Sequence, residues 1–230
     1  MTKQTKLISA LDVPELSIAL ALVDKIGDNV EWYKVGKQLF THYGPQAVQE
    51  LKARGKKVFL DMKFHDIPNT VAQAIRSAAI IGADLINVHA SGGPAMLAAA
   101  AEAMKETGKT VIAVTVLTSM DQAQLEAIGI TASPAEQVVR LAGLTQSAGL
   151  PGVVCSALEL PMLREHFGPD FLTVVPGIRP AGAEVGDQKR VMTPRKAAEA
   201  GADFIVVGRP ILAAPDPAAA AQAVLEELQG

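Results

Sequence analysis

The chain has 230 residues, a formal net charge of −3 at neutral pH and a hydrophobic fraction of 49%. This length suits one α/β domain, and the hydrophobic content excludes a disordered chain. The single cysteine, Cys155, excludes an internal disulfide, and no basic run is long enough for a nucleic-acid surface. The start lacks a long apolar signal segment, and no uninterrupted apolar stretch could span a membrane. We therefore expect a soluble cytoplasmic protein that binds neither nucleic acid nor membranes.

Short apolar runs alternate along the chain with longer, alanine-rich amphipathic segments. Runs that are apolar on both faces predict buried parallel strands, and a proline at the first turn marks several helix starts, as in Ser133-Pro134. In chain order, the expected strands are 7–11, 32–35, 57–62, 85–89, 110–117, 152–155, 171–175 and 204–207. The expected helices are about 14–26, 45–53, 68–81, 94–106, 134–148, 158–166, 194–200 and 217–228, with a further short helix in the connection after residue 117.

Eight strands, each followed by a helix, predict a parallel sheet of α/β class. Eight such units in this length fit a closed (β/α)₈ TIM barrel, with residues 1–230 forming a single domain. A doubly wound open sheet is the alternative fold. The first strand is not followed by a Gly-x-Gly-x-x-Gly turn, which weakens that alternative.

Polar side chains stand at six of the eight expected strand ends. In a barrel the carboxyl ends of all strands lie on one face, so the fold would gather these groups into one pocket. Asp61 and Lys63 are two residues apart, so their carboxylate and ammonium share one face of a strand, and these charges cannot sit unpaired in a packed interior. The alternative for Asp61 and Lys63 is a surface ion pair at the strand end. The residues are Asp12, Lys34, Asp61 with Lys63, Thr118, Arg179 and Arg209.

Two of these strand ends have the composition of a phosphate site. Pro176-Gly177-Ile178-Arg179 follows the seventh expected strand, and Gly208-Arg209 follows the eighth. Barrels often bind phosphate at this place through backbone N–H groups. Glycine lets the backbone approach the oxygens, and arginine grips them with two parallel hydrogen bonds. The alternative is a turn glycine beside a solvated arginine.

The run from Asp61 to Thr70, Asp-Met-Lys-Phe-His-Asp-Ile-Pro-Asn-Thr, resembles the signature of the orotidine 5′-phosphate decarboxylase family. The similarity extends along almost the whole chain. The other matching segments are Leu11-Asp12, Lys34-Val35-Gly36, Val116-Leu117-Thr118-Ser119, Pro176-Gly177-Ile178-Arg179 with Gln188, and Val207-Gly208-Arg209.

The resemblance implies a dimeric barrel that converts orotidine 5′-monophosphate to uridine 5′-monophosphate and CO₂ without a metal or organic cofactor. Lys63 would stabilise and then protonate a carbanion at carbon 6 of the pyrimidine ring. Lys34, Asp61 and Asp66 would hold Lys63 charged and in place, and Asp61 would also repel the substrate carboxylate. Asp66 would reach the site of the partner subunit.

The resemblance also distributes the substrate contacts. Residues 180–192 would close over the bound phosphate as a lid. The implied substrate-binding residues are Asp12, Lys34 and the partner's Thr70 for the ribose, Thr118 and Ser119 for the base, Arg179, Gln188, Gly208 and Arg209 for the phosphate, and in addition Asp61, Ile67 and Pro176.

Two other functions remain as alternatives. Metal-dependent decarboxylases or aldolases acting on sugar phosphates share the Asp-x-Lys-x-x-Asp signature, but they carry an acidic residue at the second strand to hold Mg²⁺. Here that position is Lys34, whose charge would repel the metal. A catalytically silent barrel that binds a nucleotide would be signalled by loss of Asp61, Lys63 or Asp66, and all three are present.

Overall fold

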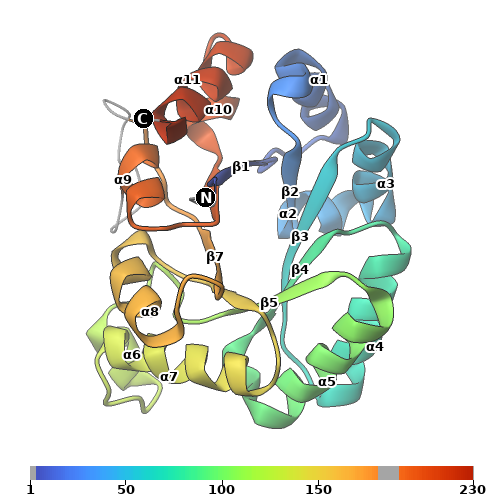
Figure 1. Cartoon of the computed structure of the whole chain (residues 1–230). Coiled ribbons are helices and arrows are strands. Elements are labelled where there is room, and N and C mark those ends of the chain that lie inside the picture. Colours follow the sequence, from blue (N-terminus) through green and yellow to red (C-terminus); the bar gives the residue numbers. More distant parts are fainter. Residues whose placement is uncertain (1–3, 181–191, 230) are drawn as a thin grey trace.

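The computed structural model describes residues 4–180 and 192–229, and these form a closed barrel of parallel strands surrounded by helices (Figure 1). The strands are β1 Lys6–Ala10, β2 Trp32–Gly36, β3 Lys57–Phe64, β4 Leu85–His89, β5 Thr110–Val114, β6 Gly152–Val154, β7 Leu172–Val175 and β8 Phe204–Val207. The α-helices are α1 Leu16–Ile26, α2 Lys37–Tyr43, α3 Pro45–Ala53, α4 Pro68–Ile80, α5 Gly93–Thr107, α6 Gln122–Ala127, α7 Pro134–Ser147, α8 Leu160–Phe167, α9 Pro194–Glu199, α10 Arg209–Leu212 and α11 Pro217–Gln229. Three 3₁₀ turns complete the set: η1 Gly27–Asn29, η2 Ala90–Gly92 and η3 Ala157–Glu159.

Each strand pairs in parallel with the next one along the chain, and β8 pairs with β1 to close the barrel. The closing register places Leu7 opposite Ile205 and Ser9 opposite Val207. The (β/α)₈ prediction is therefore confirmed, and the open sheet is excluded. The carboxyl ends of all the strands lie on one face of the barrel, and the polar residues named in the sequence analysis are found there.

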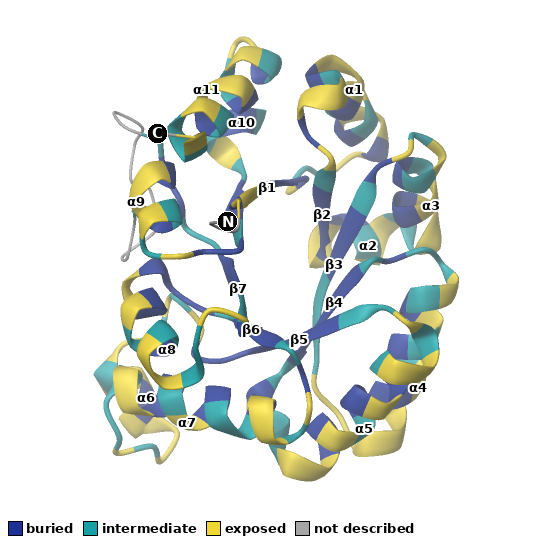
Figure 2. Cartoon of the chain, in the orientation of Figure 1, coloured by how far each residue is buried: buried dark blue, intermediate teal, exposed yellow. Residues whose placement is uncertain are grey.

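The core has two layers, one on each side of the strands. Figure 2 shows most strand residues buried and the helices carrying both buried and exposed residues. Side chains alternate along each strand, so that Leu85 of β4 points into the barrel and its neighbour Ile86 packs against the helices. The buried hydrophobic residues of the inner layer are few: Ile8, Ala10, Phe59, Leu85, Ile112, Val174 and Val206. These side chains fill the inside of the barrel and leave space for a pocket at the carboxyl ends of the strands.

Two short helices depart from the sequence prediction. Helix α2 directly follows β2, and α10 directly follows Gly208, where loops were expected. Neither helix has a side-chain cap, and each is anchored by one buried residue, Leu39 or Ile211. Strand β5 also ends earlier than predicted, at Val114, and the chain then turns. Among the described residues, no helix is both long and apolar enough to cross a membrane.

Candidate active site

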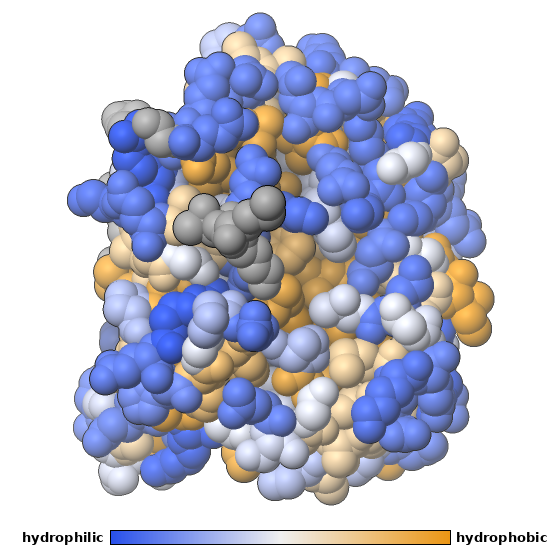
Figure 3. All heavy atoms as spheres, in the orientation of Figure 1, coloured by the Kyte–Doolittle hydropathy of each residue, from blue (hydrophilic) through white to orange (hydrophobic). Residues whose placement is uncertain are grey.

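A pocket opens at the carboxyl ends of the strands, above the inner apolar layer. It encloses about 610 Å³ of empty space, part of it continuous with solvent, which falls within the range of small-molecule sites. Figure 3 shows hydrophobic atoms in the hollow and hydrophilic atoms around its rim. The residues that line it are Lys34, Phe59, Asp61, Lys63, Val114, Val116, Leu117, Thr118, Val154, Cys155, Val174, Pro176 and Val206.

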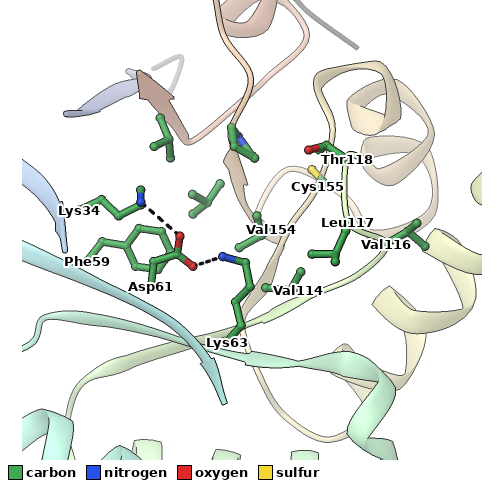
Figure 4. A pocket seen from close by; sticks show the side chains of 13 residues that line it. Lys34, Phe59, Asp61, Lys63, Val114, Val116, Leu117, Thr118, Val154 and Cys155 are labelled. Carbon is green, nitrogen blue, oxygen red and sulfur yellow. Dashed lines mark hydrogen bonds and ion pairs between the residues drawn. The ribbon is translucent and has the colours of Figure 1, made fainter. Parts of the chain in front are cut away.

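Four charged side chains form an alternating row, three of them in the wall of this pocket and the fourth, Asp12, beyond it. The Lys34 ammonium donates to Asp12 Oδ1 at 2.7 Å and lies 3.5 Å from Asp61 Oδ2. The Lys63 ammonium donates to Asp61 Oδ1 at 2.5 Å. Figure 4 shows the two lysines on either side of the Asp61 carboxylate. The row thus alternates in sign: Asp12, Lys34, Asp61, Lys63.

The largely buried Asp61 carboxylate stays ionised because of its neighbours. Burial alone would raise the pKa of Asp61, but the charges of Lys34 and Lys63 and hydrogen bonds from Lys63 and Asn87 outweigh burial and lower that pKa below its usual range. Lys34 is itself buried, with 8% of its surface exposed. Gly36 leaves room for the ion pair between Lys34 and Asp12, because a Cβ at residue 36 would lie 2.9 Å from the Lys34 ammonium and 3.0 Å from Asp12 Oδ1.

Lys63 stands on an irregular segment of β3. Among the described residues it is the only non-glycine with a positive φ, at 55°. A side chain in this left-handed region strains the backbone, and such strain is found mostly at functional sites. The register between β3 and β4 shifts between Leu60 and Phe64, which marks a bulge around Lys63. Lys63 lines the pocket together with Asp61, as the sequence predicted, but from a bulged, left-handed backbone and not from a regular strand.

A second pocket continues from the first toward the ends of β7, β8 and β1. The shared wall is formed by Lys34, Asp61, Pro176 and Val206. Gly177, Arg179, Gly208 and Arg209 line the far end, together with Ala10 and Asp12. Burial lowers the pKa of Arg179, and the positive charge of nearby Arg209 lowers that pKa further. Because two guanidinium groups line this second pocket, binding of an anion there is favourable.

Comparisons with known proteins identify the family of the chain. Residues 5–224 match the orotidine 5′-phosphate decarboxylase / HUMPS family. The orotidine 5′-phosphate decarboxylase of Halorhodospira halophila is 56% identical over 225 residues, covering 97% of this chain and 95% of the relative. That of Vibrio cholerae serotype O1 is 53% identical over 226 residues, covering 97% and 96%. The chain belongs to the orotidine 5′-phosphate decarboxylase / HUMPS family.

A solved structure of this family shows the same fold. The crystal structure of orotidine 5′-phosphate decarboxylase from Lactobacillus acidophilus superimposes with a TM-score of 0.88 and 38% sequence identity. The alignment covers 98% of this chain and 100% of that one. The family resemblance stated from the sequence is therefore confirmed over almost the whole chain.

The structure brings most of the predicted family residues to the pocket, but not all of them. Asp12, Lys34, Asp61, Lys63, Thr118, Pro176, Arg179, Gly208 and Arg209 line its two halves. Asp66, Ile67, Thr70 and Ser119 are exposed and line neither half. Ile67 exposes 67% of its surface, and its N–H is held by the Asp66 carboxylate at 2.7 Å. Gln188 and most of the expected lid lie outside the described residues.

The histidines near the family signature do not build a metal site. The rings of His65 and His89 lie 5.7 Å apart, centroid to centroid. The pKa of His89 is lowered to about 4. The largest cause is burial of the ring, followed by electrostatic repulsion from His65 and Lys63. Within residues 4–180 and 192–229, no group of three or more histidine, cysteine or acidic side chains is placed to hold a metal ion.

Sequence reasoning missed one residue that contacts the family's charged row. Asn87, inside β4, is fully buried and hydrogen-bonds both to Asp61 and to the Lys63 backbone. Its signal was present in the sequence, because a carboxamide within the apolar run Leu85-Ile86-Asn87-Val88 must find partners when buried.

Proposed function

We propose that this chain converts orotidine 5′-monophosphate to uridine 5′-monophosphate and CO₂, the last step of de novo pyrimidine nucleotide synthesis. The identity of more than half of the residues to named decarboxylases supports this activity. The enzyme is a carboxy-lyase, with residues 1–230 as one catalytic domain. Its single cysteine and its place in pyrimidine synthesis support a cytoplasmic location.

The observation that carries the proposal is the Lys63 ammonium, held by Asp61 at the mouth of an apolar pocket. Loss of CO₂ from carbon 6 leaves an electron pair on that carbon, and the ring offers no good site to delocalise it. A fixed positive charge beside the carbon stabilises the pair as it forms, and an apolar surrounding strengthens the attraction. The same ammonium then donates a proton to carbon 6 and completes uridine 5′-monophosphate.

The other charges of the row hold this group and act on the substrate. Lys34 and Asp61 keep Lys63 in a fixed electrostatic environment, and Asp12 orients Lys34 through their 2.7 Å hydrogen bond. The Asp61 carboxylate would lie beside the substrate carboxylate. Their repulsion raises the energy of the bound substrate and disappears when neutral CO₂ leaves. Asp12 and Lys34 also suit the ribose hydroxyls, and Thr118 suits the polar edge of the base.

The second pocket would bind the 5′-phosphate. Arg179 and Arg209 supply the charge, and the lack of a side chain at Gly208 lets phosphate oxygens approach the backbone. Helix α10, which begins at Arg209, corresponds to the short extra helix that often accompanies phosphate sites in barrels. Binding energy gained at the phosphate, far from carbon 6, can be used to hold the base against Lys63.

Asp66 and Thr70 take the roles proposed for them only if two chains share a site. Both are exposed on the single chain, as is Ile67, although the family signature contains all three. We therefore include in the proposal a homodimer in which Asp66 approaches the partner's Lys63 and Thr70 approaches the partner's ribose site.

Two inactive variants, Lys63→Ala and Asp66→Asn, test this arrangement. Random mixing of their subunits should restore about one quarter of the native sites, because half of the dimers become hybrids with one intact site. No recovery after dissociation and reassociation would remove the shared site from the proposal.

A metal-dependent sugar-phosphate reaction is the less favoured candidate. The Lys34 ammonium lies between the carboxylates of Asp12 and Asp61, where a divalent ion would have to bind. We propose that decarboxylation needs no metal or organic cofactor. The direct test follows the loss of orotidine monophosphate absorbance with purified protein, with and without EDTA. Turnover that survives EDTA supports the proposal, and complete loss with EDTA favours the metal-dependent reaction. Nucleotide binding without CO₂ release would indicate a silent barrel.

A further inference from the structure

Asn87 lies opposite the bulge of β3. Regular pairing between β3 and β4 is interrupted there, so that residues 61–63 of β3 stand opposite Asn87 alone. A bulge leaves backbone groups without ladder partners, and buried backbone groups need partners from elsewhere. The regular pairs on either side are Leu60 with Ile86 and Phe64 with Val88.

The side chain of Asn87 supplies partners to both ends of the bulge. Its Oδ1 accepts a hydrogen bond from the Lys63 backbone N–H at 2.8 Å. Its Nδ2 donates to Asp61 Oδ1 at 2.7 Å. A backbone N–H needs an acceptor and a carboxylate needs a donor, and a carboxamide offers both within one short, rigid group. With none of its surface exposed, Asn87 has no competing contact with solvent.

We propose that Asn87 is a positioning residue for the decarboxylation, an inference that rests on the proposed function. It acts on Lys63 in two ways. Through the backbone it stabilises the left-handed turn from which the lysine side chain leaves β3. Through Asp61 it fixes the one oxygen, Oδ1, that also receives the Lys63 ammonium.

The geometry explains why two contacts are needed. The Asp61 carboxylate has a second cation available, since Lys34 lies 3.5 Å from Oδ2. Without the Asn87 donor, the carboxylate is free to rotate toward Lys34 and draw Lys63 away from the position it holds. A shift of about 1 Å in a catalytic group can cost about a hundredfold in rate.

Three variants test the inference, each with kcat, KM, the pH profile of kcat and thermal unfolding measured. Asn87→Leu has similar size but neither donor nor acceptor. Asn87→Asp keeps an acceptor for the Lys63 N–H, loses the donor to Asp61 and adds a negative charge beside it. Val88→Ala is the matched control, because Val88 is buried on the same strand but packs among the outer core residues that face the helices.

We expect Asn87→Leu to lower kcat by about 10- to 100-fold while KM changes by less than about threefold, since the phosphate end of the pocket is untouched. The acidic limb of its pH profile should move to higher pH, because a hydrogen bond that helps to keep Asp61 ionised is gone. Asn87→Asp should lose at least as much activity as Asn87→Leu. Val88→Ala should unfold more easily but keep the native kcat and pH profile.

Two results would overturn the inference. One is native kcat in Asn87→Asp, which would mean that Asn87 only satisfies the bulge backbone. The other is an Asn87→Leu enzyme whose kcat and pH profile equal those of Val88→Ala. If Asn87→Leu does not fold, the near-isosteric Asn87→Asp decides the question alone. Failure of the proposed function would be distinct, because the unaltered chain and Val88→Ala would then also lack turnover.

Discussion

The replacement of Lys63 by methionine tests the centre of the proposed mechanism. Methionine keeps much of the length and apolar stem of lysine but lacks the ammonium. A unit charge about 4 Å from the forming carbanion contributes about 4 kcal/mol at an effective dielectric constant near 20, which corresponds to about three orders of magnitude in rate. Proton donation by a placed group supplies a further factor of about 10²–10⁴. Because one ammonium performs both tasks, the two factors do not simply multiply, and we expect a loss of at least about 10³-fold.

The fold should survive this change. Asp61 would retain Lys34 at 3.5 Å and the hydrogen bond from Asn87 at 2.7 Å, so its charge is not left without partners. Turnover is measured as loss of orotidine monophosphate absorbance at saturating substrate, and product binding by calorimetry. Lys105→Met is the control, because Lys105 is an exposed side chain on α5 that does not line the pocket. Turnover of Lys63→Met within about tenfold of this control would refute the reasoning, since the proposed acid role alone requires a larger loss.

Three further predictions test the phosphate site, the strained backbone and the buried histidine. Arg209→Ala should lower kcat/KM for the nucleotide by about 10- to 100-fold, because a charge-assisted contact is lost, and leave kcat/KM for the nucleoside orotidine nearly unchanged; an equal loss for both would make Arg209 structural. Lys63→Gly should be more stable than Lys63→Ala by about 1 kcal/mol in denaturant unfolding, because glycine relieves the left-handed strain; a more stable alanine variant would contradict this. Folding stability should fall as the pH drops from 6.5 toward 4, because the pKa of His89 is lowered to about 4 by burial and by the positive charges of His65 and Lys63, so that the unfolded chain takes up the proton first. His89→Gln should lose less stability over this range, and equal slopes for the two proteins would contradict the assignment.

The sequence predicted the barrel because its signals are local. Strands that are apolar on both faces alternate with helices, and several helix starts are marked by a proline in the first turn or by a capping residue. Ser133 does form a capping box with Glu136 in the structure. Of the two unexpected helices, α2 has neither mark, and α10 has a proline in its first turn but spans only Arg209–Leu212. Each of them buries one residue, Leu39 or Ile211, in the core, and this tertiary packing is not contained in a short local pattern.

The site was predictable to the extent that it follows from strand ends. Asp12, Lys34, Asp61 and Lys63 each close an apolar run, and the barrel brings them together as expected. The backbone of Lys63 was not predictable, because the spacing of Asp61 and Lys63 fits a regular strand equally well. The left-handed turn becomes visible only with the partner strand in place, where Asn87 compensates the interrupted ladder.

The alternating row gives the proposed reaction a direction. Asp12, Lys34, Asp61 and Lys63 sum to zero charge, so the protein can hold them in a half-buried pocket at a smaller desolvation cost than a lone charge would incur. In the proposed reaction, a bound substrate would add one negative charge at its carboxylate, next to Asp61, where it would be repelled. Departure of CO₂ would transfer that charge to carbon 6, next to Lys63, where it would be attracted. The electrons would therefore move from the least favourable place in the row to the most favourable one. This requires Asp61 and Lys63 to be fixed relative to each other, as the 2.5 Å contact between them provides.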